Sequence, residues 1–253
     1  TRMGQTSYYV TLNIGLARNE RARFIAGSVI DEFEKCGETV YKPNIVFKVS
    51  AGINRNEEDR NFDLYQKALL CTAKKMIPTY LLCDCSSDCR ADPETLSVMG
   101  CRTRVVDDLY GQKGAIGRGN IDNISINLPR LALEIDRDYR NSPLEEKLET
   151  FRKRWRDVAN VVKDILIDRY QKVVAQSVED FPTNQKFNLW KTRFDEAASL
   201  DEIFKHGTLS IGFIGLSEAF EVLSGKKFYL DGTTCLAAAG FVAFMRDYCD
   251  TLR

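Results

Sequence analysis

Cys101 is the residue of this sequence with the greatest scope for chemistry. It stands in the run Met99-Gly100-Cys101-Arg102-Thr103-Arg104, where a glycine allows a sharp turn before the thiol and two arginines flank it. A neighbouring guanidinium lowers the pKa of a thiol and favours the nucleophilic thiolate. A nucleophile also needs a base, and no local pattern ties the single histidine, His206, to Cys101. A buried, unreactive cysteine is therefore the alternative to a catalytic one.

A glycine-rich stretch and a series of asparagines follow Cys101. Asn120 comes directly after Gly117-Arg118-Gly119, and Asn123 and Asn127 follow within a segment of alternating polarity. An asparagine after glycine is typical of a turn, which is one interpretation of Asn120. The other interpretation is that Asn120 makes a polar contact to a ligand, and Asn123 and Asn127 are the alternative candidates for that contact.

Residues 208–223 contain a second candidate binding feature. The pattern predicts a strand that ends at Gly215 and leads directly into a helix that begins with Leu216 and Ser217. Free N–H groups and the helix dipole make such a terminus a site for anions. The simpler interpretation is that Ser217 caps the helix.

Cys83, Cys85 and Cys89 form a C-x-C-x3-C group that could bind zinc through three thiolates. A fourth ligand is missing nearby and the paired C-x-x-C spacing is absent, so surface thiols are the alternative. The chain has eight cysteines and lacks the apolar segment of a secretory signal, which favours reduced thiols. Residues 111–119 repeat glycine without the strand and helix that a dinucleotide-binding loop requires.

The first part of the chain is predicted to alternate between strands and helices. Strands are expected at 6–14, 44–49 and 79–83, and helices at 20–36 and 63–76. This order indicates parallel βα units, which either a barrel or an open sheet would satisfy. Residues 84–100 are polar and turn-like, and 101–109 have mixed character.

The second part is richer in helix. A strand is expected at 121–128, with apolar Ile124, Ile126 and Leu128 on one face. A long helix is predicted over 144–175, with Ser142 as its N-cap and Pro143 in its first turn. It either packs as a solvated helix or contributes a dimer contact. A last helix is expected at 233–252. We expect one compact domain, although an α/β half and a helical half are conceivable.

Composition excludes several classes of function. Lysine plus arginine and aspartate plus glutamate are balanced at 36 each, so no strong field attracts nucleic acid or an anionic membrane. No apolar run reaches the length of a bilayer crossing. The default compartment is therefore the cytoplasm.

Several motifs in this order resemble class III, anaerobic ribonucleoside-triphosphate reductases. They are Met99 to Arg102, Gly117 to Asn120, Ile126 to Leu133 (INLPRLAL) and Ile211 to Ala219 (IGFIGLSEA). Upstream segments 10–15, 44–47 and 63–69 are also similar to this family. Each piece is short, but their order and spacing extend over nearly the whole chain.

The resemblance implies a ten-stranded α/β barrel of the glycyl radical enzyme type, here partial, with a finger loop that carries a radical cysteine through its centre. It implies that Cys101 becomes a thiyl radical and removes hydrogen from C3′ of the ribose. Asn120 would hold the ribose hydroxyls, with Asn123 and Asn127 as rivals. Gly215, Leu216 and Ser217 would bind the triphosphate, and Asn13 is a further candidate for substrate contact.

The resemblance also implies groups outside this sequence. A glycyl radical would be installed by a separate activase that uses S-adenosylmethionine and an iron–sulfur cluster. Zinc is expected only in a C-terminal region that the sequence lacks, so no metal ligand is assigned. ATP and deoxyribonucleoside triphosphates are the expected effectors, formate or a thioredoxin-like thiol the reductant, and a homodimer the assembly. Residues 1–253 would be one catalytic barrel domain without the N-terminal ATP-cone and C-terminal glycyl-radical domain, inactive alone.

Three other hypotheses stay open. A non-catalytic barrel would keep the nucleotide pocket and tolerate loss of the Cys101 thiol. A different glycyl radical enzyme, with an acyl or diol substrate, would share the barrel and the finger cysteine but lack the triphosphate site. A metal scaffold would bind zinc through Cys83, Cys85 and Cys89.

Overall fold

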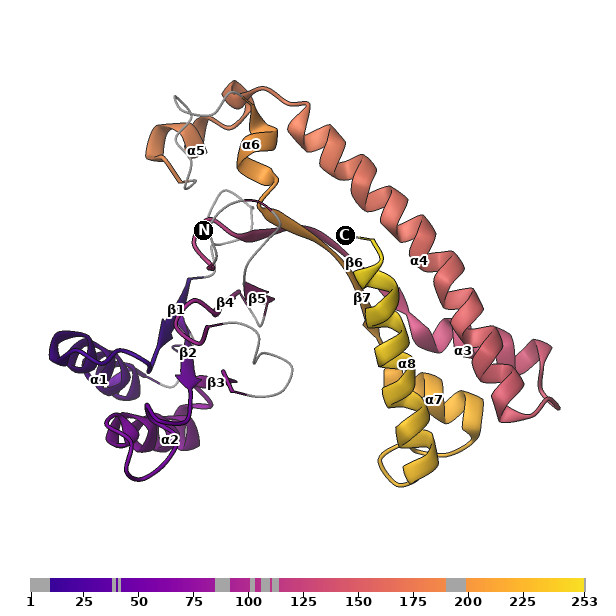
Figure 1. The fold of residues 1–253 in the computed structure, drawn as a ribbon, viewed down its shortest axis with the longest axis horizontal. Coiled ribbons are helices and arrows are strands. Elements are labelled where there is room, and N and C mark those ends of the chain that lie inside the picture. The colour runs from indigo at the N-terminus through magenta and orange to yellow at the C-terminus, as the bar shows by residue number, and fades with distance from the viewer. Residues whose placement is uncertain are drawn as a thin grey trace. The chain divides into compact units, whose positions relative to one another are not determined.

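The computed structural model describes residues 10–37, 40, 42–84, 92–100, 103–105, 110, 114–189 and 199–252 (Figure 1). The chain divides into two compact units, Thr1–Gly119 and Asn120–Arg253. Each unit is described by itself below. The expectation of one domain over residues 1–253 stays a prediction.

The first unit contains a parallel sheet of three strands in the order β1-β2-β3. The strands are β1 (Thr11–Ile14), β2 (Asn44–Val49) and β3 (Thr79–Leu82), and helices α1 (Glu20–Lys35) and α2 (Phe62–Lys75) connect them. This order confirms the predicted βα alternation. Strand β1 begins at Thr11, and residues 6–9 of the expected strand lie outside the described part of the chain.

The two helices cover one face of this sheet. Asn19 caps α1 by accepting a hydrogen bond from the Ala22 N–H at 2.9 Å, as expected of an asparagine before a helix. Helix α2 ends at Met76, whose backbone is left-handed with φ 62°. Their apolar stripes bury a cluster with the outward face of β2: Ala26, Ile30, Phe33, Ile45, Phe47, Val49, Leu64, Ala68 and Cys71.

A short antiparallel pair, β4 (Ser97–Met99) and β5 (Thr103–Val105), belongs to the same unit. The residues around β4 form a second cluster with the other face of the sheet: Leu16, Val46, Ile53, Leu81, Cys83, Leu96 and Val98. The sequence interpretation of 84–100 as turn-like missed β4, because three residues are too few to show an alternating pattern.

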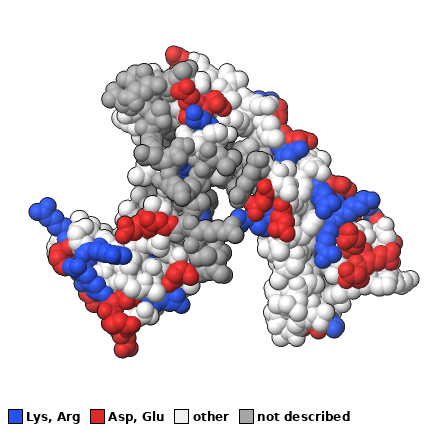
Figure 2. All heavy atoms as spheres, in the orientation of Figure 1, with Lys and Arg blue, Asp and Glu red and all other residues white. Residues whose placement is uncertain are grey.

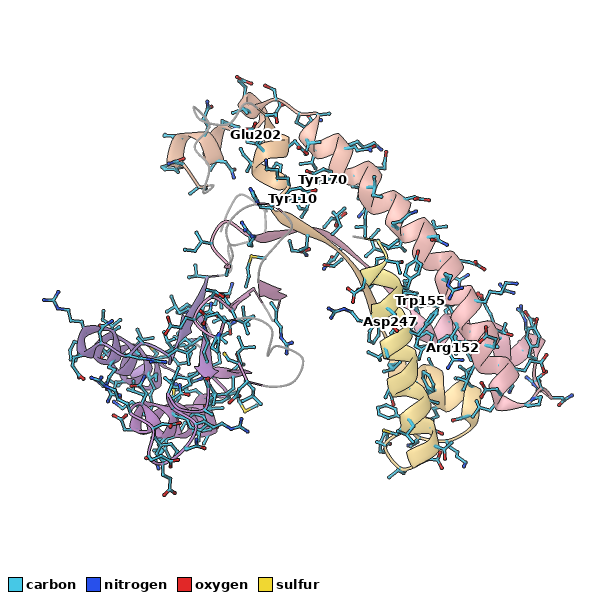
Figure 3. The ribbon with its side chains drawn as sticks, in the orientation of Figure 1. Tyr110, Arg152, Trp155, Tyr170, Glu202 and Asp247 are labelled. Atoms are coloured by element: carbon cyan, nitrogen blue, oxygen red, sulfur yellow. The ribbon has the colours of Figure 1, made fainter. Side chains whose placement is uncertain are left out.

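The second unit packs helices against two neighbouring strands. It contains strand β6 (Gly119–Asn127), helices α3 (Leu128–Asp138) and α4 (Leu144–Val174), strand β7 (Gly207–Ile214), and helices α7 (Leu216–Ser224) and α8 (Gly232–Asp250). Short helices η1 (Val178–Asp180), α5 (Pro182–Phe187) and α6 (Leu200–Phe204) lie between α4 and β7 in sequence. Trp155 of α4 lies against α8 (Figure 3), with its ring 6.2 Å from that of Phe241.

Two local predictions in this unit were wrong. Leu128 does not end strand β6 but begins α3, because Asn127 caps that helix and Pro129 suits its first turn. The N-cap of α4 is Pro143, not Ser142. The ends of α7 and α8 agree with the expected helices to within two residues.

The fold class is mixed α/β with a parallel sheet. The described strands form sheets of three, two and two strands, so a closed ten-stranded barrel is not seen among them. Acidic and basic side chains are interspersed on the face shown in Figure 2. Within the described residues, no helix has both the length and the apolar content that a bilayer crossing needs.

Candidate functional site

Cys101 itself lies outside the described residues, but the backbone that leads to it is described. Gly100, the preceding residue, has φ 60°. This left-handed conformation favours glycine, so the sharp turn expected before the thiol is confirmed. Apart from its chain neighbours, no described residue lies within 4 Å of the position that a Cβ at Gly100 would take.

Two side chains hold the carbonyl oxygen of Gly100. The Thr11 hydroxyl donates to it at 3.2 Å, and the Asn44 amide nitrogen donates to it at 3.0 Å. Thr11 and Asn44 are register partners at the beginning of β1 and β2. The donors therefore come from two adjacent strands and meet at one acceptor.

Asn13 holds the next part of the same segment. Its amide nitrogen donates to the Val98 carbonyl at 2.9 Å, and its amide oxygen accepts from the Val98 N–H at 2.8 Å. The side chain thus satisfies both backbone groups of one residue of β4. Asn13 was predicted to contact substrate, and the structure places its amide on the protein backbone.

Lys48 is a third attachment point, which the sequence analysis did not identify. It lies on β2 with only 6% of its surface exposed, and its ammonium donates to the Glu94 carbonyl at 3.2 Å. Burial lowers the pKa of Lys48, and the nearby Cys83, Glu94 and Asp92 oppose this shift. A lysine within an otherwise apolar strand sequence, NIVFKV, was the available signal.

Cys83 lies on the sheet face that carries the apolar cluster under β4. It is 1% exposed, and its thiol donates to the Leu81 carbonyl at 3.6 Å. Cys85 and Cys89 lie outside the described residues, so the proposed three-thiolate group stays untested. Among the residues that are described, no cluster of three metal-binding side chains occurs.

In the second unit, Asn120 lies on β6 beside β7. Its amide oxygen accepts hydrogen bonds from the hydroxyls of Thr208 and Ser210, each at 3.3 Å. With the amide turned over, its nitrogen donates to the Thr208 carbonyl at 2.8 Å. Asn120 therefore belongs to a strand and not to the turn that was its alternative interpretation, and it connects two strands.

The rivals of Asn120 have different environments. Asn123, Ser125 and Asn127 are exposed, whereas Ile126 on the opposite face is buried, which confirms the predicted alternation. The Asn127 side chain accepts from the Arg130 N–H at 3.1 Å and is thereby committed to capping α3. Among the described residues, Asn120 is the one of the three whose side chain forms hydrogen bonds with β7.

Strand β7 leads into the N-terminus of α7. The N-cap is Gly215, with φ 74° and no side-chain cap, so Ser217 lies inside the first turn and is not the cap. The first N–H groups of a helix have no acceptor within it. Glu218 supplies a negative charge in this first turn, which complements the helix dipole and would compete with a bound anion.

Gly215 is also a point of close packing. A Cβ added there would lie 2.3 Å from Cγ of Pro129, in the first turn of α3. Helix α7 buries Ala219, Phe220 and Leu223 in the core of the unit. The turn that exposes the α7 N-terminus is therefore firmly packed.

One strand thus connects the predicted features of the second unit. Near its beginning β7 contributes the hydroxyls of Thr208 and Ser210 to Asn120, and at its end it leads to Gly215. Neutral amide and hydroxyl groups suit the hydroxyls of a sugar, and helix N–H groups suit a phosphate.

Comparison with known proteins found matches that extend over most of the chain. The family profile described as anaerobic ribonucleoside-triphosphate reductase matches residues 1–253. The reductase of that name from Escherichia coli is 30% identical over 241 residues, and that of Haemophilus influenzae 29% over 243; each match covers 91% of this chain and 32% of the relative. The enzyme of that name from phage T4 is 27% identical over 233 residues, covering 88% of this chain and 37% of the relative. The chain thus spans about a third of the length of these relatives.

Proposed function

Because this chain belongs to the anaerobic ribonucleoside-triphosphate reductase family, we propose that it forms the central catalytic barrel of an enzyme that converts ribonucleoside triphosphates to 2′-deoxyribonucleoside triphosphates. The match over the whole chain, residues 1–253, is the observation that carries this proposal. The parallel β1-β2-β3 sheet, with helices on one face and β4 on the other, suits one part of a ten-stranded barrel.

Cys101 is the proposed catalytic residue, as a thiyl radical. Its sulfur takes the hydrogen atom from C3′ of the ribose, because an S–H bond and an activated C–H bond are similar in strength. The 2′-hydroxyl then takes a proton and leaves as water. A reductant, formate or a thioredoxin-like thiol, supplies two electrons, and the Cys101 S–H returns a hydrogen atom to C3′. Placement of the sulfur is the protein's main contribution to this step.

Asn120 is proposed to hold the ribose hydroxyls. Its amide adds hydrogen-bonding groups without adding charge. Thr208 and Ser210 lie within hydrogen-bonding distance of this amide, and in its turned-over orientation the Thr208 carbonyl accepts from it. A substrate hydroxyl would compete with or extend these bonds, which are 3.3 Å long.

Gly215, Leu216 and Ser217 are proposed to bind the triphosphate through backbone N–H groups. The absence of a side-chain cap on Gly215 supports this role. Asn13 is assigned differently from the sequence hypothesis, because its amide is committed to Val98. We propose a positioning role for it below.

The remaining components are proposed from the family. A glycyl radical, installed by an S-adenosylmethionine and iron–sulfur activase, supplies the oxidation of the Cys101 thiol. ATP and deoxyribonucleoside triphosphates are the proposed effectors, a homodimer the assembly and the cytoplasm the location.

Substitution of the thiol tests this function. The longest natural polypeptide that contains this sequence is activated without oxygen, and deoxyribonucleotide formation is measured for the wild type, Cys101→Ser and Cys36→Ser. Cys36 is an exposed cysteine at the end of α1 and serves as the control. Cys101→Ser should abolish product, and Cys36→Ser should retain it.

Nucleotide binding separates the alternatives. If Cys101→Ser retains activity, the radical role is wrong. If the wild type binds ribonucleoside triphosphates but forms no product, a non-catalytic nucleotide-binding barrel explains the chain. If it binds none, another glycyl radical enzyme with an acyl or diol substrate becomes the better explanation.

A further inference from the structure

Side chains of the sheet β1-β2-β3 bond the backbone of residues 94–100, which are called the finger segment. Among the strands that the structure describes, β4 pairs only with β5. Yet Asn13 bonds both backbone groups of Val98, and Thr11 and Asn44 both bond the Gly100 carbonyl. These three residues are called the finger clamp.

The spacing of the clamp shows that it is a regular structure. Along β1, Thr11 and Asn13 are two residues apart and therefore point to the same face. Along the finger segment, their partners Gly100 and Val98 are also two residues apart, in the opposite direction. Thr11 and Asn13 thus bond alternate residues, Gly100 and Val98, in an antiparallel sense, and Asn44 bonds Gly100 a second time from the neighbouring strand.

The bonds to the Gly100 carbonyl are the ones nearest to Cys101 along the chain. The Gly100 carbonyl belongs to the peptide unit that joins Gly100 to Cys101, and a peptide unit is planar and rigid. Glycine has the widest freedom of rotation of all residues, so without a restraint on this carbonyl the unit could adopt several orientations. The hydrogen bonds that Thr11 and Asn44 donate to the Gly100 carbonyl select one of these orientations.

We propose that Thr11, Asn13 and Asn44 are positioning residues that orient the peptide unit before Cys101 for hydrogen abstraction from the substrate. This inference rests on the proposed reductase function. The clamp residues act through the backbone of the segment that precedes Cys101. Lys48, through its bond to the Glu94 carbonyl, anchors the beginning of the same segment.

A double variant of Thr11 and Asn44 tests their positioning role. Thr11→Val keeps the shape of threonine but removes its donor, and combined with Asn44→Ala it leaves the Gly100 carbonyl without both partners. Thr11→Ser is the matched control, because it keeps the hydroxyl. The variants are made in the longest natural polypeptide, and reduction of ribonucleoside triphosphate and of its 3′-deuterated form is compared.

We expect the double variant to lose kcat by about ten- to a hundredfold, the scale of a misplaced reacting group, with KM little changed. The 3′-deuterium isotope effect should rise, because hydrogen abstraction becomes the slow step. Thr11→Ser should behave as the wild type. An unchanged kcat overturns the inference. So does a loss that follows the folded fraction with an unchanged isotope effect, because that marks a structural role only.

Hydrogen exchange tests the clamp without any need for activity. Asn13→Ala removes both the acceptor of the Val98 N–H and the donor to the Val98 carbonyl, whereas Thr11→Ser keeps every bond of the clamp. Exchange at Val98 should accelerate in Asn13→Ala and stay slow in Thr11→Ser. Equal exchange in both would overturn the clamp itself. If exchange behaves as expected while the wild type forms no deoxyribonucleotide, the clamp stands and the proposed function fails.

Discussion

The glycines at the two ends of α7 allow a controlled test of the close packing at the proposed triphosphate site. Gly215 and Gly225 have almost the same left-handed backbone, with φ 74° and 71°. A Cβ at Gly215 would lie 2.3 Å from the Pro129 ring, whereas nothing lies within 4 Å of one at Gly225. Alanine at either position therefore imposes the same backbone strain, but only one of them imposes a clash.

The expected magnitudes follow from these two terms. A left-handed alanine costs roughly 1–2 kcal/mol of unfolding free energy, and this is the whole effect expected of Gly225→Ala. Forcing a methyl group against a packed ring adds roughly 1–3 kcal/mol. Gly215→Ala should therefore lower the unfolding free energy by the sum of both terms. Proline is a stiff ring at the beginning of α3, so it cannot rotate away as a flexible side chain would.

Denaturation with guanidinium, followed by the fluorescence of Trp155, measures this difference. Trp155 is 1% exposed and shares a hydrophobic cluster with Phe220 of α7. The chain has two tryptophans, so a Trp190→Phe background makes Trp155 the only reporter. Equal losses in Gly215→Ala and Gly225→Ala would refute the packing argument.

The same pair tests the triphosphate site. If nucleotides bind at the α7 N-terminus, Gly215→Ala should weaken the affinity for a ribonucleoside triphosphate, because the N–H groups at the turn must shift. Gly225→Ala, at the other end of the helix, should leave the affinity unchanged. Equal affinities in the two variants would show that the triphosphate binds elsewhere.

Three further outcomes are expected. Asn127→Ala should lower the unfolding free energy by about 1 kcal/mol through loss of the α3 cap, and Asn127→Asp should restore it in denaturation experiments. Burial raises the pKa of the Cys71 thiol, so in native protein iodoacetamide should label the exposed Cys36 well before Cys71; equal labelling by mass spectrometry would contradict the buried position. The hydroxyl and N–H of Thr234 lower the pKa of Asp231 to about 2, below its unfolded value of about 3.9. This stabilisation is complete at neutral pH and is lost as pH falls from about 4 towards 2. Asp231→Asn should flatten that decline in acid-titrated melting temperatures, and an unchanged decline would exclude the cap as its source.

The parts of the fold that could be predicted are those with long, regular patterns. Helices α1 and α2 bury residues at helical spacing, and β2 between them is a mostly apolar, buried strand. Strands β4 and β5 have three residues each, and no periodicity can be read from three residues. Helix α3 was missed for a different reason: the alternating pattern of β6 continues up to Leu128, where the capping asparagine and the proline change the structure.

Asparagine residues show why the site was harder to predict than the fold. Asn13, Asn120 and Asn127 are all polar residues at the edge of apolar patterns, and the same pattern is compatible with a ligand contact, a strand contact or a helix cap. The structure assigns each a different protein partner: the Val98 backbone, the hydroxyls of β7 and the Arg130 N–H. An amide has two donors and an acceptor oxygen with two lone pairs, so only three-dimensional contacts show which of them the fold already uses.

Asn13 makes the distinction concrete. One N–H and one lone pair of its amide are engaged with Val98, and a substrate that displaced the amide would leave two backbone groups of a 7% exposed residue unsatisfied. Each buried group left without a partner costs roughly 1–3 kcal/mol. A ligand bond that merely replaces such a contact yields little net binding energy. A positioning role requires no such loss, because the bonds of Asn13 to Val98 stay intact. It also explains why Thr11 of β1 and Asn44 of β2 are polar: both side chains bond the Gly100 carbonyl and so orient the backbone before Cys101.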